Sequence, residues 1–234
     1  MAIQKIIYVL WLGDEEINNC RKNAIDNMPK NTVLITKHNL DDYILKDYPL
    51  HPAYAYLSTI HKSDYLRCYL MHHYGGGYSD VKYTNILWDD AFEKLEKNNG
   101  LMMIGVKTTF GHTYAGIEEW SNQMKNEIIS KIDYLLCMCW FICKPKSLIT
   151  TEWYNELNKK LDEYLYLLIK CPATFTRECY HPSLCYALDR PDWEGISTNE
   201  KTEYPISWNI LLSQILYPLQ IRYLNNIDNT MINQ

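Results

Sequence analysis

The sequence lacks any hydrophobic run long enough to cross a membrane as a helix. Its longest apolar stretch, residues 135–143, falls well short of the roughly 20 residues that a bilayer core requires. A basic run is also missing, because 23 Lys and Arg are mixed along the chain with 28 Asp and Glu, for a net charge of −5. We therefore expect no transmembrane segment and no nucleic-acid partner.

The sequence features of a secreted protein stabilised by disulfides are missing as well. No Asn-x-Ser/Thr sequon occurs, and eight cysteines in 234 residues do not look like a disulfide framework. Cys137, Cys139 and Cys143 lie in an apolar stretch without the Cys-x2-Cys pairs of metal sites, which favours buried thiols. The apolar N-terminus is followed at once by acidic residues, with no small-residue cleavage site, so we expect a first strand rather than a signal peptide. These features favour a cytoplasmic protein.

The length suits one sizeable core and is short for two, so we expect a single domain over the whole chain. Residues 4–12 and 32–36 are predicted strands, with a helix over about 14–27 between them. The strand–helix–strand order is typical of an α/β fold with parallel strands. Ligands of such sheets bind beyond the carboxyl ends of the strands, where Trp11 and His38 lie.

The remaining pattern predicts further helices and strands, with a turn-rich loop over 108–116 that could cover a substrate. Helices are expected over 39–47, up to His73, over 88–97, over 147–170, from His181 and over 206–216, and strands over 101–106 and 136–143.

The most informative stretch is residues 62–82, which is predicted to form a helix, a glycine turn and a strand that carries an acid. No proline or glycine interrupts it before Gly75, and its leucines are four residues apart, as on a helix face. Gly75, Gly76 and Gly77 accept the positive φ that ends a helix and makes a tight turn. The following residues, 78–82, are predicted to form the strand.

This arrangement places acids and bases on shared faces. Tyr78, Asp80 and Lys82 alternate along the predicted strand, and Asp64 and Arg67 are three apart on the helix. Asp64 and Arg67 could form an exposed ion pair that contributes only a few tenths of a kcal/mol, or both could face one cleft together with Asp80. Lys82 could lie on the face of Asp80 or turn out to solvent.

Two blocks in this order resemble the DXD-type sugar transferases, a family that includes initiating mannosyltransferases and capsular polysaccharide enzymes. The blocks are K-I-I-Y-V-L-W-L-G at 5–13 and S-D-x-x-R at 63–67 followed by Y-G-G-G-Y-x-D at 74–80. The resemblance covers roughly residues 4–90. It implies a GT-A fold, a single Rossmann-like nucleotide-sugar-binding domain whose mixed sheet is flanked by helices. The bias towards Tyr, Asn, Ile and Lys is typical of AT-rich genomes and would suit a viral member.

The resemblance also implies roles for particular residues. Asp80, Arg67 and Asp64 are expected to be catalytic, with Trp11 as a plate for the nucleobase, although a tryptophan there could also be plain core. The residues expected to contact the donor are Leu10, Trp11, His38, Asp64, Arg67, Gly76, Gly77, Tyr78 and Lys82. From the C-terminal half, Glu178, His181, Trp208 and Asn209 could complete the site.

The implied activity is transfer of a sugar from a UDP- or GDP-linked donor to a hydroxyl of a glycan acceptor. The alternative is a catalytically degenerate module of the same fold that binds a nucleotide or glycan without turnover. One departure bears on the cofactor, because Lys82 stands where the family has its second acid. We therefore expect Asp80 to hold Mn²⁺ or Mg²⁺ less firmly than two acids would, and mainly when nucleotide is present.

Overall fold

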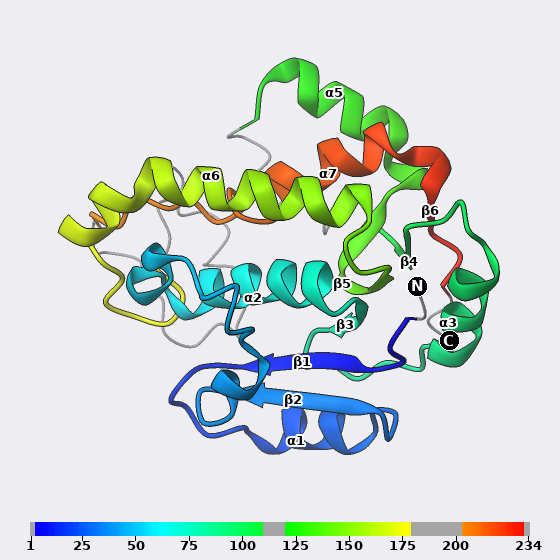
Figure 1. Ribbon diagram of the computed structural model, residues 1–234, viewed down its shortest axis with the longest axis horizontal. Coiled ribbons are helices and arrows are strands. Elements are labelled where there is room, and N and C mark those ends of the chain that lie inside the picture. Colours follow the sequence, from blue (N-terminus) through cyan, green and yellow to red (C-terminus); the bar gives the residue numbers. More distant parts are fainter. Residues whose placement is uncertain (1–2, 110–119, 179–202, 232–234) are drawn as a thin grey trace.

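A computed structural model of the protein describes residues 3–109, 120–178 and 203–231 (Figure 1). The strands of these segments form one sheet in the order β2-β1-β3-β5-β4-β6. Their bounds are β1 Ile7–Trp11, β2 Thr32–Thr36, β3 Gly76–Ser79, β4 Met103–Lys107, β5 Leu136–Cys143 and β6 Ile227–Asp228. β1 is parallel to β2 and β3, β4 is parallel to β6, and β5 is antiparallel to both of its neighbours, β3 and β4. The predicted α/β class with a mixed sheet is confirmed.

Helices cover both faces of this sheet (Figure 1). They are α1 Asn19–Asp26, α2 Thr59–His73, α3 Trp88–Lys97, α5 Asn122–Lys131, α6 Leu148–Lys170 and α7 Ser213–Arg222, with 3-10 turns η1 Leu40–Tyr43, η2 Pro52–Tyr56, η4 Ile132–Tyr134 and η6 Leu224–Asn226. α2 packs on the sheet, and α6 in turn packs against α2 and α7. None of the described helices is both long and apolar enough to span a bilayer.

The core is divided by the sheet into two clusters, because neighbouring side chains of a strand point to opposite faces. Tyr8 of β1 packs in the larger cluster with residues of α2, α6 and α7, including Leu66 and Trp153. Its neighbour Ile7 packs in the smaller cluster with α3, including Trp88. Every one of these side chains is almost fully buried, so α2 and α3 are fixed on opposite faces of the central strands.

Several predicted bounds differ from the structure. α1 begins at Asn19 rather than near residue 14, because the side chain of Asn18 accepts a hydrogen bond from the backbone N–H of Arg21 and caps the helix there. Only η1 forms within 39–47. A last helix was predicted over 206–216, but α7 begins at Ser213 and ends at Arg222. The carbonyl of Ser207, which lies before α7, is in hydrogen-bond contact with the buried His61 ring at 3.1 Å.

The predicted strand over 78–82 is also shifted, since β3 ends at Ser79. The N–H of Lys82 donates to the carbonyl of Asp80 at 2.8 Å, a tight turn that stops the ladder. Predictions for α3, β5 and α6 are confirmed almost to the residue, and β4 begins at Met103 rather than at 101. Most of the predicted loop and the predicted helix from His181 lie outside the described residues.

β5 is irregular next to the end of β3. Lys107 of β4 pairs with Leu136, whereas Gly105 pairs with Phe141, so β5 has the longer path over this interval. Such an irregularity changes the direction of backbone groups where the pairing of two strands is interrupted. Here it turns the carbonyl of Met138 towards α2, while that of Cys139 accepts from the N–H of Asp80 at 2.9 Å.

Candidate functional site

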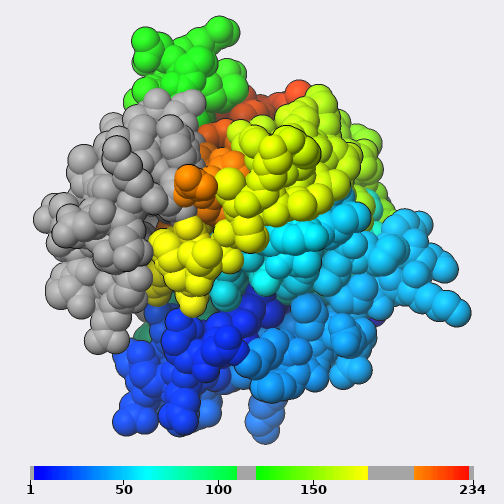
Figure 2. Space-filling model, turned by 90° about the vertical axis from the view of Figure 1, so that its left-hand side faces the viewer, coloured from blue at the N-terminus to red at the C-terminus, as the bar shows by residue number. Residues whose placement is uncertain are grey.

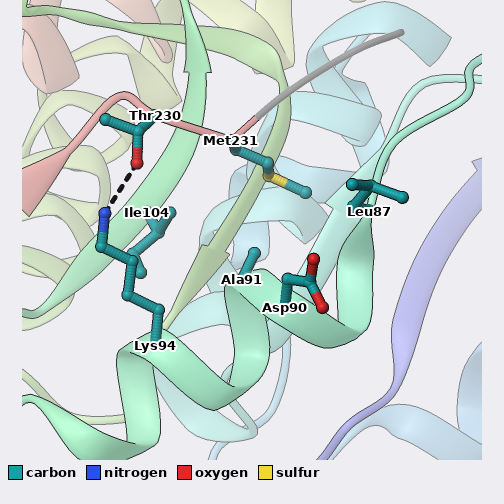
Figure 3. Close-up of a pocket in the computed structure, with 7 residues that line it drawn as sticks. All are labelled: Leu87, Asp90, Ala91, Lys94, Ile104, Thr230 and Met231. Atoms are coloured by element: carbon teal, nitrogen blue, oxygen red, sulfur yellow. Dashed lines mark hydrogen bonds between the residues drawn. The ribbon is translucent and has the colours of Figure 1, made fainter.

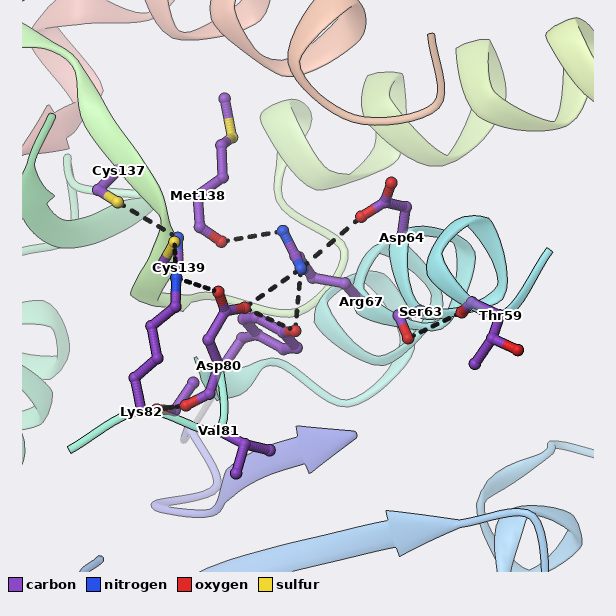
Figure 4. Close-up of polar contacts among 12 residues, drawn as sticks. Thr59, Ser63, Asp64, Arg67, Asp80, Val81, Lys82, Cys137, Met138 and Cys139 are labelled. Carbon is purple, nitrogen blue, oxygen red and sulfur yellow. Dashed lines mark hydrogen bonds and ion pairs between the residues drawn. The ribbon is translucent and has the colours of Figure 1, made fainter. Parts of the chain in front are cut away.

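The end of β3 carries the site, and α2 brings the partner residues to it (Figure 4). α2 and β3 are joined by a reversal in which Gly75 and Gly76 have φ of 67° and 87°. A Cβ on Gly76 would lie 2.7 Å from the carbonyl oxygen of Ile6, and a Cβ on Gly77 would lie 2.9 Å from the Trp88 ring. Both glycines are therefore needed for the close approach of β3 to its neighbours, whatever else they do. Their expected contact with a donor stays a prediction.

Arg67 is the centre of the site. Only 7% of this residue is exposed. Its Nη1 donates to the carbonyl of Met138 at 3.0 Å, and its Nη2 donates to the hydroxyl of Tyr78 at 2.9 Å and to Oδ1 of Asp80 at 3.4 Å. Nη2 also lies 3.7 Å from Oδ1 of Asp64. The buried Nε has no hydrogen-bond partner within the described part of the chain.

Both oxygens of Asp80 are engaged. Oδ1 accepts from Arg67 and, at 3.1 Å, from the hydroxyl of Tyr78, while Oδ2 lies 2.9 Å from Nζ of Lys82. Lys82 therefore faces Asp80, which decides between the two orientations that the sequence left open. Its Nζ also lies 3.5 Å from Sγ of Cys139 and 5.5 Å from the centre of the Trp140 ring, and its side chain is 49% exposed.

These contacts set the charges of the site. Burial alone would raise the pKa of Asp80, but Arg67 and Lys82 outweigh it and hold that pKa below its usual range. For Asp64, burial dominates and, with the charge of Asp80, raises the pKa to about 7 against the opposing effect of Arg67. Lys82 keeps a raised pKa because the Asp80 carboxylate outweighs the effect of burial. A pKa of about 7 leaves Asp64 only about half ionised near neutral pH, so the charges of Arg67 and Lys82 outweigh those of the two carboxyl groups and the site has a net positive charge.

The burial of Asp64 and Arg67 excludes one of the two interpretations that the sequence left open for them. They do not form an exposed intrahelical pair, because both are buried and Arg67 contacts three other residues. The structure thus brings together Asp64, Arg67, Tyr78, Asp80 and Lys82. Leu10 lies instead in the larger core cluster, and His38 is an exposed residue just beyond β2.

Trp11 is linked to the site formed by Arg67, Asp80 and Lys82 through a residue that was not predicted from the sequence. Arg21 of α1 lies over the Trp11 ring, 5.2 Å from its centre, and donates to the carbonyl of Val81 at 3.3 Å. The indole N–H of Trp11 donates to the carbonyl of Glu15 at 2.9 Å. Trp11 is therefore partly exposed rather than core. No sequence signal marks Arg21, because its position depends on where α1 begins.

Segments from the C-terminal half approach the same end of the molecule. Figure 2 looks onto the end towards which β1 and β2 run, and the blue N-terminal part, the yellow part before residue 179 and the orange part after residue 202 are all visible there. Thr176 donates to the Glu15 carboxylate at 3.0 Å, and the buried Glu178 accepts from Thr174. Asn209 is buried, and a role of Glu178, Trp208 or Asn209 in a site stays a prediction. His181 lies outside the described residues.

The donor set around Asp80 does not fit a divalent cation. A hard cation prefers several oxygen ligands, carboxylates above all. Here the only acid of the strand end already receives Arg67, Tyr78 and Lys82, and within the described ranges no group of three or more His, Cys, Asp or Glu is placed to hold a metal. The expected Mn²⁺ or Mg²⁺ would have to displace the Lys82 ammonium, which repels it.

A separate pocket lies on the other face of the sheet, between α3 and the C-terminal segment (Figure 3). It is lined by Leu87, Asp90, Ala91, Lys94, Ile104, Thr230 and Met231. Lys94 pairs there with Asp228 at 2.6 Å and donates to Thr230 at 2.7 Å. None of the predicted site residues lines this pocket, so it is not the site formed by Arg67 and Asp80.

Comparison with known proteins finds a similarity to one family over the part of the chain that contains this site. A family model described as "Glycosyltransferase sugar-binding region containing DXD motif" matches residues 14–86, the segment that runs from the end of β1 through α2 and β3. No curated protein and no solved structure matches the chain. The resemblance to DXD-type glycosyltransferases is confirmed by this match, and the α/β architecture is consistent with a GT-A domain.

Proposed function

We propose that this protein is a glycosyltransferase that moves a hexosyl or deoxyhexosyl group from a UDP- or GDP-linked sugar to a hydroxyl of a glycan acceptor, as in polysaccharide biosynthesis. The single observation that carries the proposal is the net positive cluster of Arg67, Asp80 and Lys82 beyond the carboxyl end of β3, inside the matched segment. A sheet that binds nucleotides does so at that edge. We also propose that the chain acts as a single catalytic domain, since the described strands form one sheet.

The reaction makes a specific demand on the site. The bond between the anomeric carbon and the diphosphate oxygen breaks, its electron pair stays on the diphosphate, and the acceptor oxygen bonds to the carbon and loses its proton. Fixed cations aimed at the diphosphate stabilise the charge that develops there. Arg67 and Lys82 supply such cations, and Asp80 orients both of them. We propose that Asp64, which lies 3.7 Å from Nη2 of Arg67, receives sugar hydroxyls.

Trp11 is proposed to stack on the nucleobase. It is partly exposed at the carboxyl end of β1, and Arg21 covers one side of its ring. Stacking of a base on an aromatic ring contributes roughly 1–3 kcal/mol. Trp11→Ala should therefore weaken the binding of UDP or GDP, measured by titration calorimetry, by about tenfold or more. Unchanged affinity in a folded variant would remove Trp11 from the donor site.

The decisive experiment is hydrolysis of nucleotide sugars without any acceptor, screened over UDP- and GDP-linked hexoses and deoxyhexoses. We expect slow release of UDP or GDP by the wild-type protein and its loss in Asp80→Asn, because an amide cannot hold two cations in place. Asp89→Asn is the matched control, since Asp89 is an exposed acid in the first turn of α3. Nucleotide binding without hydrolysis would favour the degenerate binding module, and absence of binding would refute the proposal.

A further inference from the structure

The segment Asp80-Val81-Lys82 has a lysine at the position where a two-acid motif has its second carboxylate. In the structure this lysine does not turn away. Its ammonium lies 2.9 Å from Oδ2 of Asp80, beside the outer oxygen of the carboxylate (Figure 4). A positive charge is therefore already fixed on the acid that is expected to hold a metal ion.

The other oxygen of Asp80 offers no better place for a metal. Oδ1 accepts from the buried Arg67 and from Tyr78, so a cation there would face the guanidinium. Asp64 lies on the far side of Arg67 from Lys82, with Oδ1 3.7 Å from Nη2 of Arg67, so the guanidinium stands between the two acids (Figure 4). Asp64 and Asp80 therefore cannot act as the two carboxylates of one metal site.

The same contacts leave N–H donors and a positive charge available to an anion. Lys82 is half exposed and has three N–H donors, of which the neighbouring Asp80 and Cys139 use at most two. Nε of Arg67 is a buried donor without a partner within the described segments. The sum of Arg67, Lys82 and Asp80 is one positive charge, and Arg21 reaches the backbone of Val81 between Asp80 and Lys82. A diphosphate at the half-exposed Lys82 ammonium would balance this charge and accept from its remaining N–H.

We propose that Lys82 takes the place of a divalent cation, so that this protein binds and uses its nucleotide diphosphate donor without metal. This inference rests on the proposed function, because it requires a nucleotide diphosphate sugar as the donor. As the bond from the anomeric carbon to the diphosphate oxygen breaks, the electron pair stays on that oxygen and the ammonium of Lys82 stabilises it by a charged hydrogen bond. The acceptor oxygen forms the new bond and its proton passes to the surrounding water, so no further reactant is required.

The first experiment measures nucleotide affinity. UDP and GDP are titrated into EDTA-treated protein by calorimetry, with and without added Mn²⁺. We expect the dissociation constant of the wild-type protein to be the same in both conditions. Lys82→Ala should weaken binding by about tenfold or more, the effect of one charge-assisted hydrogen bond. Lys46→Ala is the matched control, because Lys46 is an exposed lysine outside the cluster, and it should bind as the wild type does.

The second experiment measures the metal itself, through the electron paramagnetic resonance signal of free Mn²⁺. Wild-type protein should leave the signal unchanged, whereas Lys82→Asp, which supplies the missing second acid, should bind Mn²⁺ in the presence of UDP or GDP. Circular dichroism shows whether the variant is folded, and Lys82→Asn replaces it if it is not. With the asparagine variant, which removes the repelling ammonium, Mn²⁺ binding should again exceed that of the wild type.

The outcomes separate this inference from the proposed function. Stoichiometric Mn²⁺ binding by the wild-type protein, with nucleotide affinity lost in EDTA, would overturn the role of Lys82 while leaving a glycosyltransferase in place. Equal Mn²⁺ binding by wild type and variants would also overturn it. Failure of UDP and GDP to bind under every condition would overturn both the inference and the proposed function.

Discussion

The guanidinium of Arg67 lies over the ring of Tyr78, 4.1 Å from its centre, and also donates to the hydroxyl of that ring. This double contact joins α2 to β3 at the point where β3 ends. It holds the charge of Arg67 in place before any ligand arrives, which is what electrostatic stabilisation of a leaving group requires. The arginine is thus a structural residue as well as a candidate catalytic one.

Arg67→Ala should therefore destabilise the fold as well as abolish transfer. Removal of one partner of a buried ion pair costs about 3–5 kcal/mol when the remaining charge is left unpaired. Here Asp80 keeps its ion pair with Lys82, so we expect a loss of stability below that range. Urea denaturation measures the change. Arg222→Ala is the control, since it breaks the exposed pair with Glu152 and should change stability little. A fully stable Arg67→Ala protein would show that the buried contacts contribute little to folding.

Asp64→Asn should alter how stability depends on pH. The folded-state pKa of about 7 lies above the ordinary value of 3.8, so the folded protein holds a proton that the unfolded chain releases. The associated stability is complete below pH 3.8 and is lost as pH rises through 7. The amide does not titrate. Between pH 3.8 and 7 the free energy of unfolding of the variant should therefore rise relative to that of the wild type, by at most about 1.4 kcal/mol per pH unit.

Urea denaturation of both proteins at several pH values tests this expectation, with Asp89→Asn as the exposed control. A difference between Asp64→Asn and wild type that stays constant from acid to neutral pH would show that folding does not raise the pKa of Asp64.

Gly77→Ala should destabilise the protein by about 1–3 kcal/mol, the range for overpacking of a core. A Cβ there would lie 2.9 Å from the Trp88 ring and 3.2 Å from Ile142, and neither side chain can swing away within the core. Thermal unfolding measures the loss. The matched control is Gly100→Ala, whose Cβ would meet only the flexible side chain of Asn98 at 3.3 Å. Equal melting points for the two variants would contradict the packing argument.

His73→Phe should make the protein less sensitive to acid. Burial, with the nearby His72 and Lys146, lowers the pKa of His73 to about 4, and neither ring nitrogen has a partner within the described chain. The neutral form is favoured in the fold, so its stability is present above pH 6.5 and is lost as pH falls towards 4. The ring packs against Tyr69 and Tyr154, with centroids 4.4 and 5.0 Å away, and phenylalanine preserves these contacts.

Melting points of His73→Phe and wild type, compared at neutral pH and near pH 5, provide the measurement, and His38→Phe serves as the exposed control. We expect the variant to lose fewer degrees than the wild type on acidification. An equal loss in both proteins would assign the acid sensitivity to other groups.

The parts of the fold that depend on local chemistry can be predicted from the sequence. α3, β5 and α6 follow from side-chain periodicity, and the reversal between α2 and β3 follows from glycines that adopt positive φ. The shared helix face of Asp64 and Arg67 follows from their spacing of three. The bounds of α1 and α7 did not follow in the same way, because a cap and a buried histidine contact decide them.

The ion pairs, hydrogen bonds and pKa values of the site residues depend on tertiary contacts and could not be predicted from the sequence. Lys82 pairs with Asp80 because β3 ends at Ser79 and the chain turns there. Arg67 is buried on α2 and donates to the carbonyl of Met138 in β5, a contact between residues 71 apart in sequence. The charge and pKa of each group depend on burial and on neighbours from other strands and helices, and one-dimensional spacing contains neither.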